Sequence, residues 1–234
     1  MEAVQVWLVK TFRRWGPPER LRVDNGWPWG SGGDLPTVLA LWLWGLGCEL
    51  IWNRPGHPQE NGTVERFHGL LDAWGEPGQS ADCDAWARQV EWVVHTQRSV
   101  YPAVNGRSRE EAYPELEQNP RRLPAESPLV WDIERVRSRL AKGQWRRQVD
   151  KVGQISLYHR TYGVGRVWAG QEVHVRFDGE RNEWVVLDKQ GTEIARRVSQ
   201  EICPERILRS EISHLKPHEQ HRTDRHNIPA HLVT

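Results

Sequence analysis

Two short segments of this 234-residue chain each place an acidic side chain close to an Asn-Gly pair. Asp24 stands in LRVDNGWPWG and Glu65 in HPQENGTVERFHG, with 40 residues between the two acids. Carboxylate oxygens are the ligands that hard divalent cations prefer. Two such ions about 4 Å apart can activate an attacking hydroxyl group and stabilise a leaving oxyanion in phosphodiester chemistry. The two acids are therefore candidate metal ligands of a catalytic site.

Each acid also has a purely structural interpretation. An Asp before Asn-Gly is commonly a turn residue. A Glu in the first turn of a helix commonly does no more than interact favourably with the helix dipole. Neither acid taken alone therefore establishes a site.

The elements around the two acids predict an α/β arrangement. Residues 19–26, ERLRVDNG, predict a short strand that places Asp24 at its carboxyl end, where α/β proteins hold their sites. Residues 63–74 carry apolar side chains at helical spacing, so Glu65 should lie near the start of a helix. Residues 35–47, LPTVLALWLWGLG, are apolar nearly all round and predict a buried helix. Further helices are predicted over residues 3–15 and 82–99, and a further strand over residues 48–53.

Residues 1–113 form the first part of the chain. Three further parts follow it. Residues 114–148 predict a proline-containing linker and then a basic helical arm. Residues 149–200 contain short strands separated by turns with glycine, which predicts a small SH3-like β-barrel. Residues 201–234 are polar without clear periodicity and predict a flexible tail.

The formal net charge of +1 hides an uneven distribution. Residues 1–118 carry a net charge of −5 and residues 119–151 carry +5. Acidic clusters attract metal ions, and basic segments attract phosphate.

The three cysteines are far apart, which fits reduced thiols in a cytoplasm better than a disulfide framework. No apolar run approaches the roughly 20 residues of a membrane span, so we expect a cytoplasmic, nucleoid-associated protein.

Several motifs in a fixed order resemble a known family. LRVDNG, the apolar helix and strand that follow, PGHPQENGTVERFHG and YPAVNGRSREEAYP resemble the second half of the catalytic core of DDE transposases and retroviral-type integrases. The closest likeness is to transposases of bacterial insertion sequences, and it covers about residues 1–113. The strands over residues 154–188 are similar to the small barrel that follows this core in many such transposases and helps to bind DNA ends.

The resemblance implies a ribonuclease H-like fold in which two Asp and one Glu surround Mg²⁺ or Mn²⁺. Asp24 matches the middle acid, the Asp of a strand-terminal DNG. Glu65 matches the last acid, the Glu of an NGxxER helix. The implied function is DNA transposition or integration, by cutting element ends and joining them to target DNA.

The chain departs from the family's pattern at its front. Only 23 residues precede Asp24, and the acids among them are Glu2 and Glu19. Neither occupies the place of the family's first Asp on an earlier strand. We therefore expect a partial core that lacks its first strands, binds magnesium weakly and is inactive alone. We also expect the apolar helix 35–47 to lack part of its cover, so that residues 1–113 are marginally stable as a monomer.

Six basic side chains are candidates for DNA contact, with solvated surface charge as the alternative for each. Arg54, Arg66 and His68 lie near Glu65 in the sequence, and Arg146, Arg147 and Lys151 lead into the predicted barrel. Contacts of this kind hold phosphates and position DNA without reading its sequence. The expected partners are element-end and target DNA, a second copy of the chain, or an intact transposase.

Two other functions remain open on the sequence. One is a non-catalytic DNA-binding or partner-binding protein that regulates an intact transposase by entering its oligomer. The other is a metal-dependent nuclease on the same fold, against which the basic arm and barrel-like strands argue. Dependence on magnesium and on the two acids separates a catalyst from a binding module.

Overall fold

The computed structural model describes residues 2–30, 34–75, 77–116, 128–208 and 215–217. Their contacts divide the chain into two compact units, Met1–Trp52 with Leu123–Thr234, and Asn53–Arg122. The first 52 residues thus belong to the same unit as the C-terminal half of the chain.

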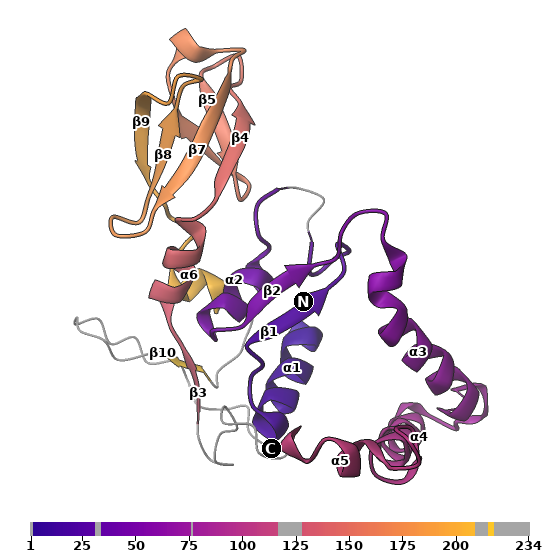
Figure 1. Cartoon of the computed structure of the whole chain (residues 1–234). Coiled ribbons are helices and arrows are strands. Elements are labelled where there is room, and N and C mark those ends of the chain that lie inside the picture. The colour runs from indigo at the N-terminus through magenta and orange to yellow at the C-terminus, as the bar shows by residue number, and fades with distance from the viewer. Residues whose placement is uncertain (1, 31–33, 76, 117–127, 209–214, 218–234) are drawn as a thin grey trace. The chain divides into compact units, whose positions relative to one another are not determined.

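The first unit begins with an α/β segment whose elements agree with the predictions (Figure 1). It contains α1 (Glu2–Trp15), β1 (Arg20–Val23), α2 (Val38–Gly45) and β2 (Glu49–Trp52). Gly16, with a φ of 83°, ends α1 ahead of two prolines. Thr37 caps α2 by accepting a hydrogen bond from the backbone N–H of Ala40. β1 and β2 pair in parallel, from Arg20 opposite Glu49 to Val23 opposite Trp52.

Helix α2 is the centre of the core of this unit. Leu39 to Leu43 are each at most 1% exposed. Phe12 of α1 stacks on Trp42 with ring centroids 6.5 Å apart. The fully buried Trp131 donates its indole N–H to the carbonyl of Trp42 at 3.0 Å. Burying each side chain of this size contributes about 1.5–3 kcal/mol.

The expectation that α2 lacks part of its cover is wrong. The cover comes from β3 (Leu129–Trp131), α6 (Ile133–Leu140) and α7 (Pro204–Ile207), which lie far away in the sequence. The backbone N–H of Asp132 also donates to the carbonyl of Gly45 at 3.0 Å. Segments predicted as linker, arm and tail therefore complete this core.

The basic arm is not a continuous helix, because α6 ends at Leu140 and a strand follows. β4 (Gln144–Gln148) carries Trp145, which is 7% exposed and packs edge-on against Trp184 with centroids 5.7 Å apart. Exposed Gln144 and Arg146 flank this tryptophan. In a strand, buried and exposed side chains alternate, as they do here. In a helix, the side chains of one face recur every three or four residues.

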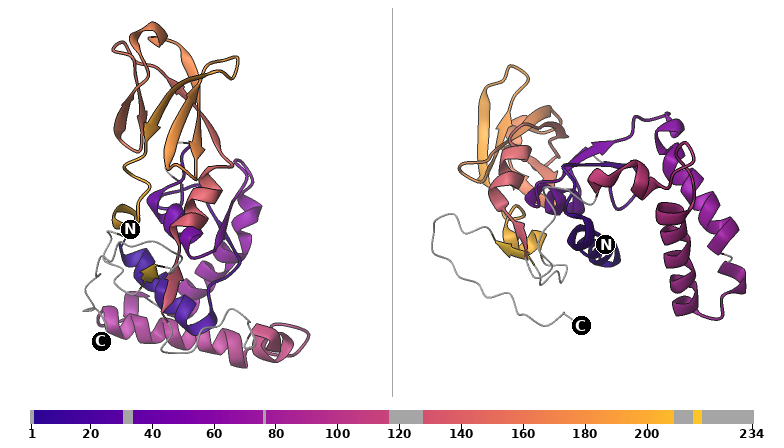
Figure 2. Two further views of the ribbon diagram at one scale, coloured as in Figure 1. Left: turned by 90° about the vertical axis from the view of Figure 1, so that its left-hand side faces the viewer. Right: turned by 60° about the horizontal axis from the view of Figure 1, so that its bottom comes forward.

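The antiparallel part of the first unit is a sheet and a hairpin (Figure 2). A four-stranded sheet has the order β4-β7-β8-β9, and β5 pairs only with β6. The new strands are β5 (Gln154–Leu157), β6 (Arg160–Gly163), β7 (Glu172–Asp178), β8 (Glu183–Leu187) and β9 (Glu193–Val198). The predicted barrel is therefore corrected: the described strands do not close, because β4 and β9 remain the two edges of their sheet.

Trp184 is fully buried at the centre of this part. It packs against Phe177 with ring centroids 4.8 Å apart.

The predicted tail also begins differently, because Glu201 and Ile202 are buried and α7 follows them. β10 (Leu215–Pro217) pairs in parallel with β3. Residues 209–214 and 218–234 of the predicted tail lie outside the described part, as do residues 117–127 of the predicted linker.

The second unit is helical. It contains a 3-10 turn (Pro58–Asn61), α3 (Gly62–Gly75), a 3-10 turn (Pro77–Gln79), α4 (Cys83–His95), a π-helical turn (Thr96–Val100), α5 (Arg109–Ala112) and a 3-10 turn (Pro114–Leu116). Asp82 caps α4 through the backbone N–H of Ala85, and Ser108 forms a capping box with Glu111 at α5. The predicted helix over residues 82–99 is confirmed, with its last turn widened.

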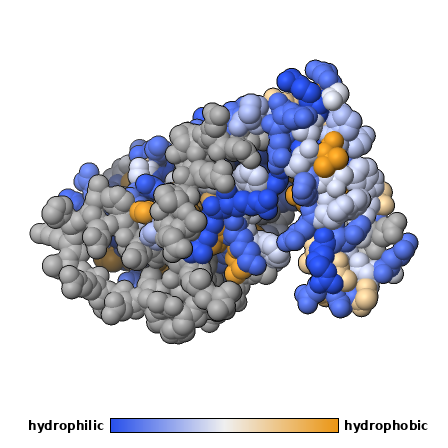
Figure 3. Space-filling view, turned by 90° about the horizontal axis from the view of Figure 1, so that it is seen from below, coloured by the Kyte–Doolittle hydropathy of each residue, from blue (hydrophilic) through white to orange (hydrophobic). Residues whose placement is uncertain are grey.

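The second unit leaves several large apolar side chains exposed. They include Phe67 of α3 and Trp86 and Trp92 of α4. On the face seen in Figure 3, hydrophobic side chains lie singly among hydrophilic ones outside the grey atoms.

None of the described helices is both long enough and apolar enough to cross a membrane.

Candidate functional site

Asp24 directly follows the last residue of β1, as predicted. Because β1 and β2 are parallel, Asp24 lies at the edge where the carboxyl ends of both strands meet. Its Oδ1 accepts a hydrogen bond from the backbone N–H of Gly26 at 2.9 Å. The side chain is exposed, and within the described part of the chain it has no ion-pair partner. The turn bond occupies one carboxylate oxygen and leaves the other available to a ligand.

Glu65 lies in the first turn of α3, also as predicted. Its side chain is exposed and forms no ion pair with any residue that the structure describes. Glu65 belongs to the second unit and Asp24 to the first. Among the described residues, no three His, Cys, Asp or Glu side chains gather to hold a metal ion.

The loop that leads into α3 is held by its own side chains. Glu60 accepts hydrogen bonds from both the backbone N–H and the Nε of Arg54, at 2.8 and 2.7 Å. Asn53 donates to the side-chain oxygen of Asn61. The predicted DNA-binding residue Arg54 therefore shapes this loop, while its guanidinium is still largely exposed. Arg66 and His68, the other two candidates here, are exposed on α3.

The three candidates of the first unit have different surroundings. Arg146 is exposed, and its nearest acid, Glu172, is 3.9 Å away. Lys151 is exposed in the turn after β4. Arg147 is instead bound to both carboxylate oxygens of Asp34, at 2.9 Å each, and donates its Nε–H to the carbonyl of Ser156. Arg146 and Lys151 thus present exposed cations, of which Arg146 has an acid at the limit of ion-pair distance, whereas Arg147 ties β4 to the loop before α2.

The ion pair with Arg147 also shifts the titration of Asp34. Partial burial by itself would raise the pKa of this carboxyl. The hydrogen bond and the charge of Arg147 outweigh the burial, so the pKa lies below its usual value. Asp34 therefore keeps its negative charge at neutral pH and neutralises Arg147.

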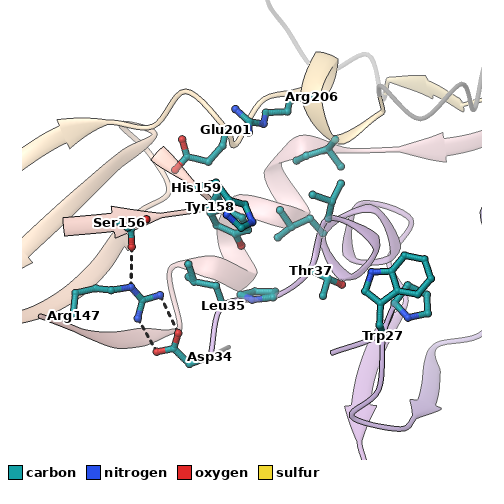
Figure 4. Close-up of a pocket in the computed structure, with 15 residues that line it drawn as sticks. Trp27, Asp34, Leu35, Thr37, Arg147, Ser156, Tyr158, His159, Glu201 and Arg206 are labelled. Carbon is teal, nitrogen blue, oxygen red and sulfur yellow. Dashed lines mark hydrogen bonds and ion pairs between the residues drawn. The ribbon is translucent and has the colours of Figure 1, made fainter. Parts of the chain in front are cut away.

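A cavity of about 540 Å³ opens beside this ion pair, and the sequence did not predict it (Figure 4). The loop before α2 contributes Trp27, Asp34 and Leu35, and β4 contributes Arg147. The turn between β5 and β6 contributes Tyr158 and His159, and the segment at α7 contributes Glu201 and Arg206. Four segments that are distant in the sequence therefore build one hollow within the first unit.

The turn that carries Tyr158 and His159 has an uncommon backbone. Both residues have positive φ, 49° and 63°, and Leu157 pairs with Arg160 across the two-residue turn. Such turns favour Asn-Gly, because a side chain in the left-handed region costs roughly 1–2 kcal/mol. This turn has neither residue, so the sequence gives no local signal for it. Local rules are broken in this way most often at functional sites.

The hydroxyl groups of two tyrosines near the cavity differ in their partners. The Tyr158 hydroxyl oxygen is buried and has no hydrogen-bond partner in the described part of the chain. The Tyr162 hydroxyl donates to Glu201, which also accepts from the indole N–H of Trp184 at 2.7 Å. A buried unpaired polar group costs about 1–3 kcal/mol. Tyr158 is therefore the exception in an otherwise satisfied polar cluster.

Burial is the largest cause that raises the pKa of both tyrosines. The charge of Glu201 adds to it for Tyr158, and the hydrogen bond to Glu201 adds to it for Tyr162. Both pKa values lie far above the value of about 10 of an unfolded chain. Below that value, both hydroxyls are protonated in the folded and the unfolded protein, and their contribution to stability is complete. Above it, only the unfolded protein releases these protons.

We therefore expect the stability of the first unit to fall as pH rises above about 10. The slope is about 1.4 kcal/mol per pH unit for each tyrosine. Urea unfolding at pH 9, 10 and 11 measures it. The Tyr158→Phe/Tyr162→Phe double variant should lose less stability over this range than the native chain, whereas Tyr113→Phe, at an exposed position of the second unit, should not differ from it. Parallel curves for the native and double-variant proteins would contradict the expectation.

No protein-family model matches this chain. The chemistry of the sites therefore rests on the residues themselves. At one sheet edge the first unit presents a carboxylate without an ion pair, and beside α2 it presents a cavity with aromatic, cationic and hydroxyl groups. The first offers one oxygen ligand, and the second suits the binding of a planar ligand.

Proposed function

We propose that this chain takes part in DNA transposition or integration as a DDE-type transposase of the bacterial insertion-sequence kind. The observation that carries the proposal is the position of Asp24. It stands immediately after β1 of a parallel strand pair, at the edge where α/β proteins hold catalytic groups. In this proposal, β1, β2 and the helices α1 to α3 belong to a ribonuclease H-like core.

The acids that the proposal uses differ from neighbouring acids in their partners. Glu49 of β2 contacts Arg20 and Arg139, at 3.4 and 2.6 Å. Asp24 and Glu65 are exposed and have no ion pair among the residues described. Carboxylates that no cation of the protein neutralises are the ones available to a divalent cation. The proposal accordingly includes Mg²⁺ or Mn²⁺ as cofactor, with each of the two acids as a candidate oxygen ligand.

The test is a DNA nicking and joining assay on the full chain. The substrate is a duplex that carries the DNA flanking the gene, supplied with Mg²⁺ or Mn²⁺. Asp24→Asn and Glu65→Gln should each lower the joining rate about 100-fold or more, because transition-state charge loses its stabilisation. DNA affinity should stay within about twofold of the native chain, because neither change removes a cation that holds phosphate.

The matched control for this assay is Asp72→Asn. Asp72 is an exposed acid on the same helix as Glu65, and this change should leave joining at the native rate. Joining that survives in Asp24→Asn and Glu65→Gln would refute the catalytic assignment of the two acids.

A second candidate function is a non-catalytic protein that binds DNA, or enters the oligomer of an intact transposase. The exposed side chains of Arg66 and Lys151 favour it, because contacts of such cations with phosphate need no metal ion. DNA binding without joining, unchanged in Asp24→Asn and Glu65→Gln, would support this alternative. Absence of both joining and DNA binding would contradict the transposase function and the DNA-binding form of this alternative, and would leave only entry into a transposase oligomer.

A further inference from the structure

A second hollow on the surface lies next to the cavity of the first unit. This groove of about 520 Å³ is lined by β6 and β9 and by the residues next to them, with Arg160 and Arg197 among them. His159 lines both the cavity and the groove. The two hollows are therefore neighbours that share one side chain at the tip of the β5–β6 turn.

The cavity offers an aromatic surface with few unmatched charges. Trp27 is 72% exposed at its margin, and Tyr158 lies among the lining side chains (Figure 4). Asp34 neutralises Arg147, and Glu201 already accepts hydrogen bonds from Trp184 and Tyr162. A volume of about 540 Å³ is within the range of pockets that bind small organic ligands. The chemistry favours a flat aromatic group.

Two polar groups of the cavity are left without partners. The Tyr158 hydroxyl has no hydrogen bond, and Arg206 forms no ion pair with any carboxylate in the part of the chain that the structure describes. A hydroxyl and a guanidinium together suit the polar edge of an aromatic ring and an anionic group attached to it. A nucleotide combines these features.

The groove is cationic, and no acid lines it. One nitrogen of Arg160 donates to Gln200, and one of Arg197 donates to a backbone carbonyl, so both guanidinium groups keep further donors. Arg196, one residue away, differs sharply, because it contacts Asp178, Glu183 and Glu193. Guanidinium groups that no acid neutralises favour phosphate.

We propose that the cavity and the groove together bind an unpaired stretch of DNA strand. One base enters the cavity against Trp27 and Tyr158, and the neighbouring phosphates lie along Arg160 and Arg197. A base can enter a cavity only after it leaves the helical stack, so the ligand is a single strand or a frayed end and not an intact duplex. This inference rests on the proposed function, because strand breakage and joining expose such ends.

The test compares the binding of three ligands to the full chain by fluorescence anisotropy. The ligands are a labelled ten-nucleotide single strand, a duplex of the same sequence, and the mononucleotide dAMP as a competitor. Trp27→Ala should weaken single-strand binding about tenfold and leave duplex binding unchanged, because base stacking is lost. Single-strand binding as tight as that of the native chain would overturn the proposal.

Two further variants test the cavity hydroxyl and the groove. Tyr158→Phe should weaken single-strand binding about fivefold, for one lost hydrogen bond, with an unchanged or higher melting temperature. Arg160→Gln/Arg197→Gln should flatten the dependence of log affinity on log salt by about 1.4, or about 0.7 for each lost phosphate contact. The control, Arg176→Gln, removes an exposed arginine of β7 that bonds Gln144, and should leave the slope unchanged.

Each outcome has a distinct meaning. Unchanged single-strand binding in Trp27→Ala and in the double arginine variant, with duplex joining intact, would overturn this inference and leave the proposed function standing. If dAMP displaced the labelled strand as effectively as the unlabelled oligonucleotide does, the cavity would be a site for a free nucleotide. That result would overturn the proposal that the ligand is a DNA strand. Failure of the native chain to bind any DNA would contradict the proposed function as well.

Discussion

Trp131→Ala is expected to lower the free energy of unfolding of the first unit by about 3–5 kcal/mol. The indole is fully buried against α2, so its removal leaves a cavity that the packed neighbours cannot fill. The change also removes the hydrogen bond from its N–H to the carbonyl of Trp42. Urea unfolding followed by near-ultraviolet circular dichroism measures the loss.

The same contact can be tested from the other side. A Cβ atom on Gly45 would stand 2.0 Å from the indole nitrogen of Trp131. Gly45→Ala should therefore destabilise the first unit by about 1–3 kcal/mol through overpacking. Trp86→Ala, at a tryptophan that is 42% exposed in the second unit, is the control and should cost less than 1 kcal/mol. A loss below 1 kcal/mol for Trp131→Ala would contradict the role of β3 as part of this core.

Glu201→Ala is expected to cost the first unit about 2–5 kcal/mol. Glu201 is 3% exposed and accepts hydrogen bonds from the indole N–H of Trp184 and the hydroxyl of Tyr162. Alanine would leave both donors buried without an acceptor. Chemical denaturation at pH 7 measures the change, with the intrinsic tryptophan fluorescence of the chain as the signal.

Two comparison variants separate the hydrogen bonds of Glu201 from its charge. Glu201→Gln keeps one acceptor oxygen and should cost less than Glu201→Ala. Glu205→Ala removes an exposed acid of α7 and should be nearly neutral. Equal losses for Glu201→Ala and Glu205→Ala would show that the buried carboxylate does not hold the segment at α7 against the sheet.

Strong local patterns explain which elements could be predicted. Residues 3–15, 63–74 and 82–99 have apolar side chains at helical spacing, and the structure has helices there. The LRVDNG segment alternates apolar and polar residues before a turn, which places Asp24 after β1. These features depend on neighbours within a few residues, so the sequence reports them directly.

Elements whose structure depends on distant partners could not be predicted. Trp131 and Ile207 stand in segments with prolines and charges, yet both are buried in the first unit, where β3 and α7 pack against α2. Trp145 stands among arginines that suggested a helical arm, and the sheet buries it on β4. The alternation of apolar and polar residues predicts strands within residues 144–198. Whether these strands close into a barrel depends on whether the two edge strands of the sheet pair with each other.

Local sequence patterns were enough to predict the elements and the position of each acid on them: Asp24 at the end of a strand and Glu65 at the start of a helix. Charge pairing could be known only from the folded chain, because Arg147 meets Asp34 across 113 residues of sequence. The cavity likewise exists only after four distant segments meet around Tyr158. Local periodicity is a property of neighbouring residues, whereas burial and charge pairing belong to the folded chain.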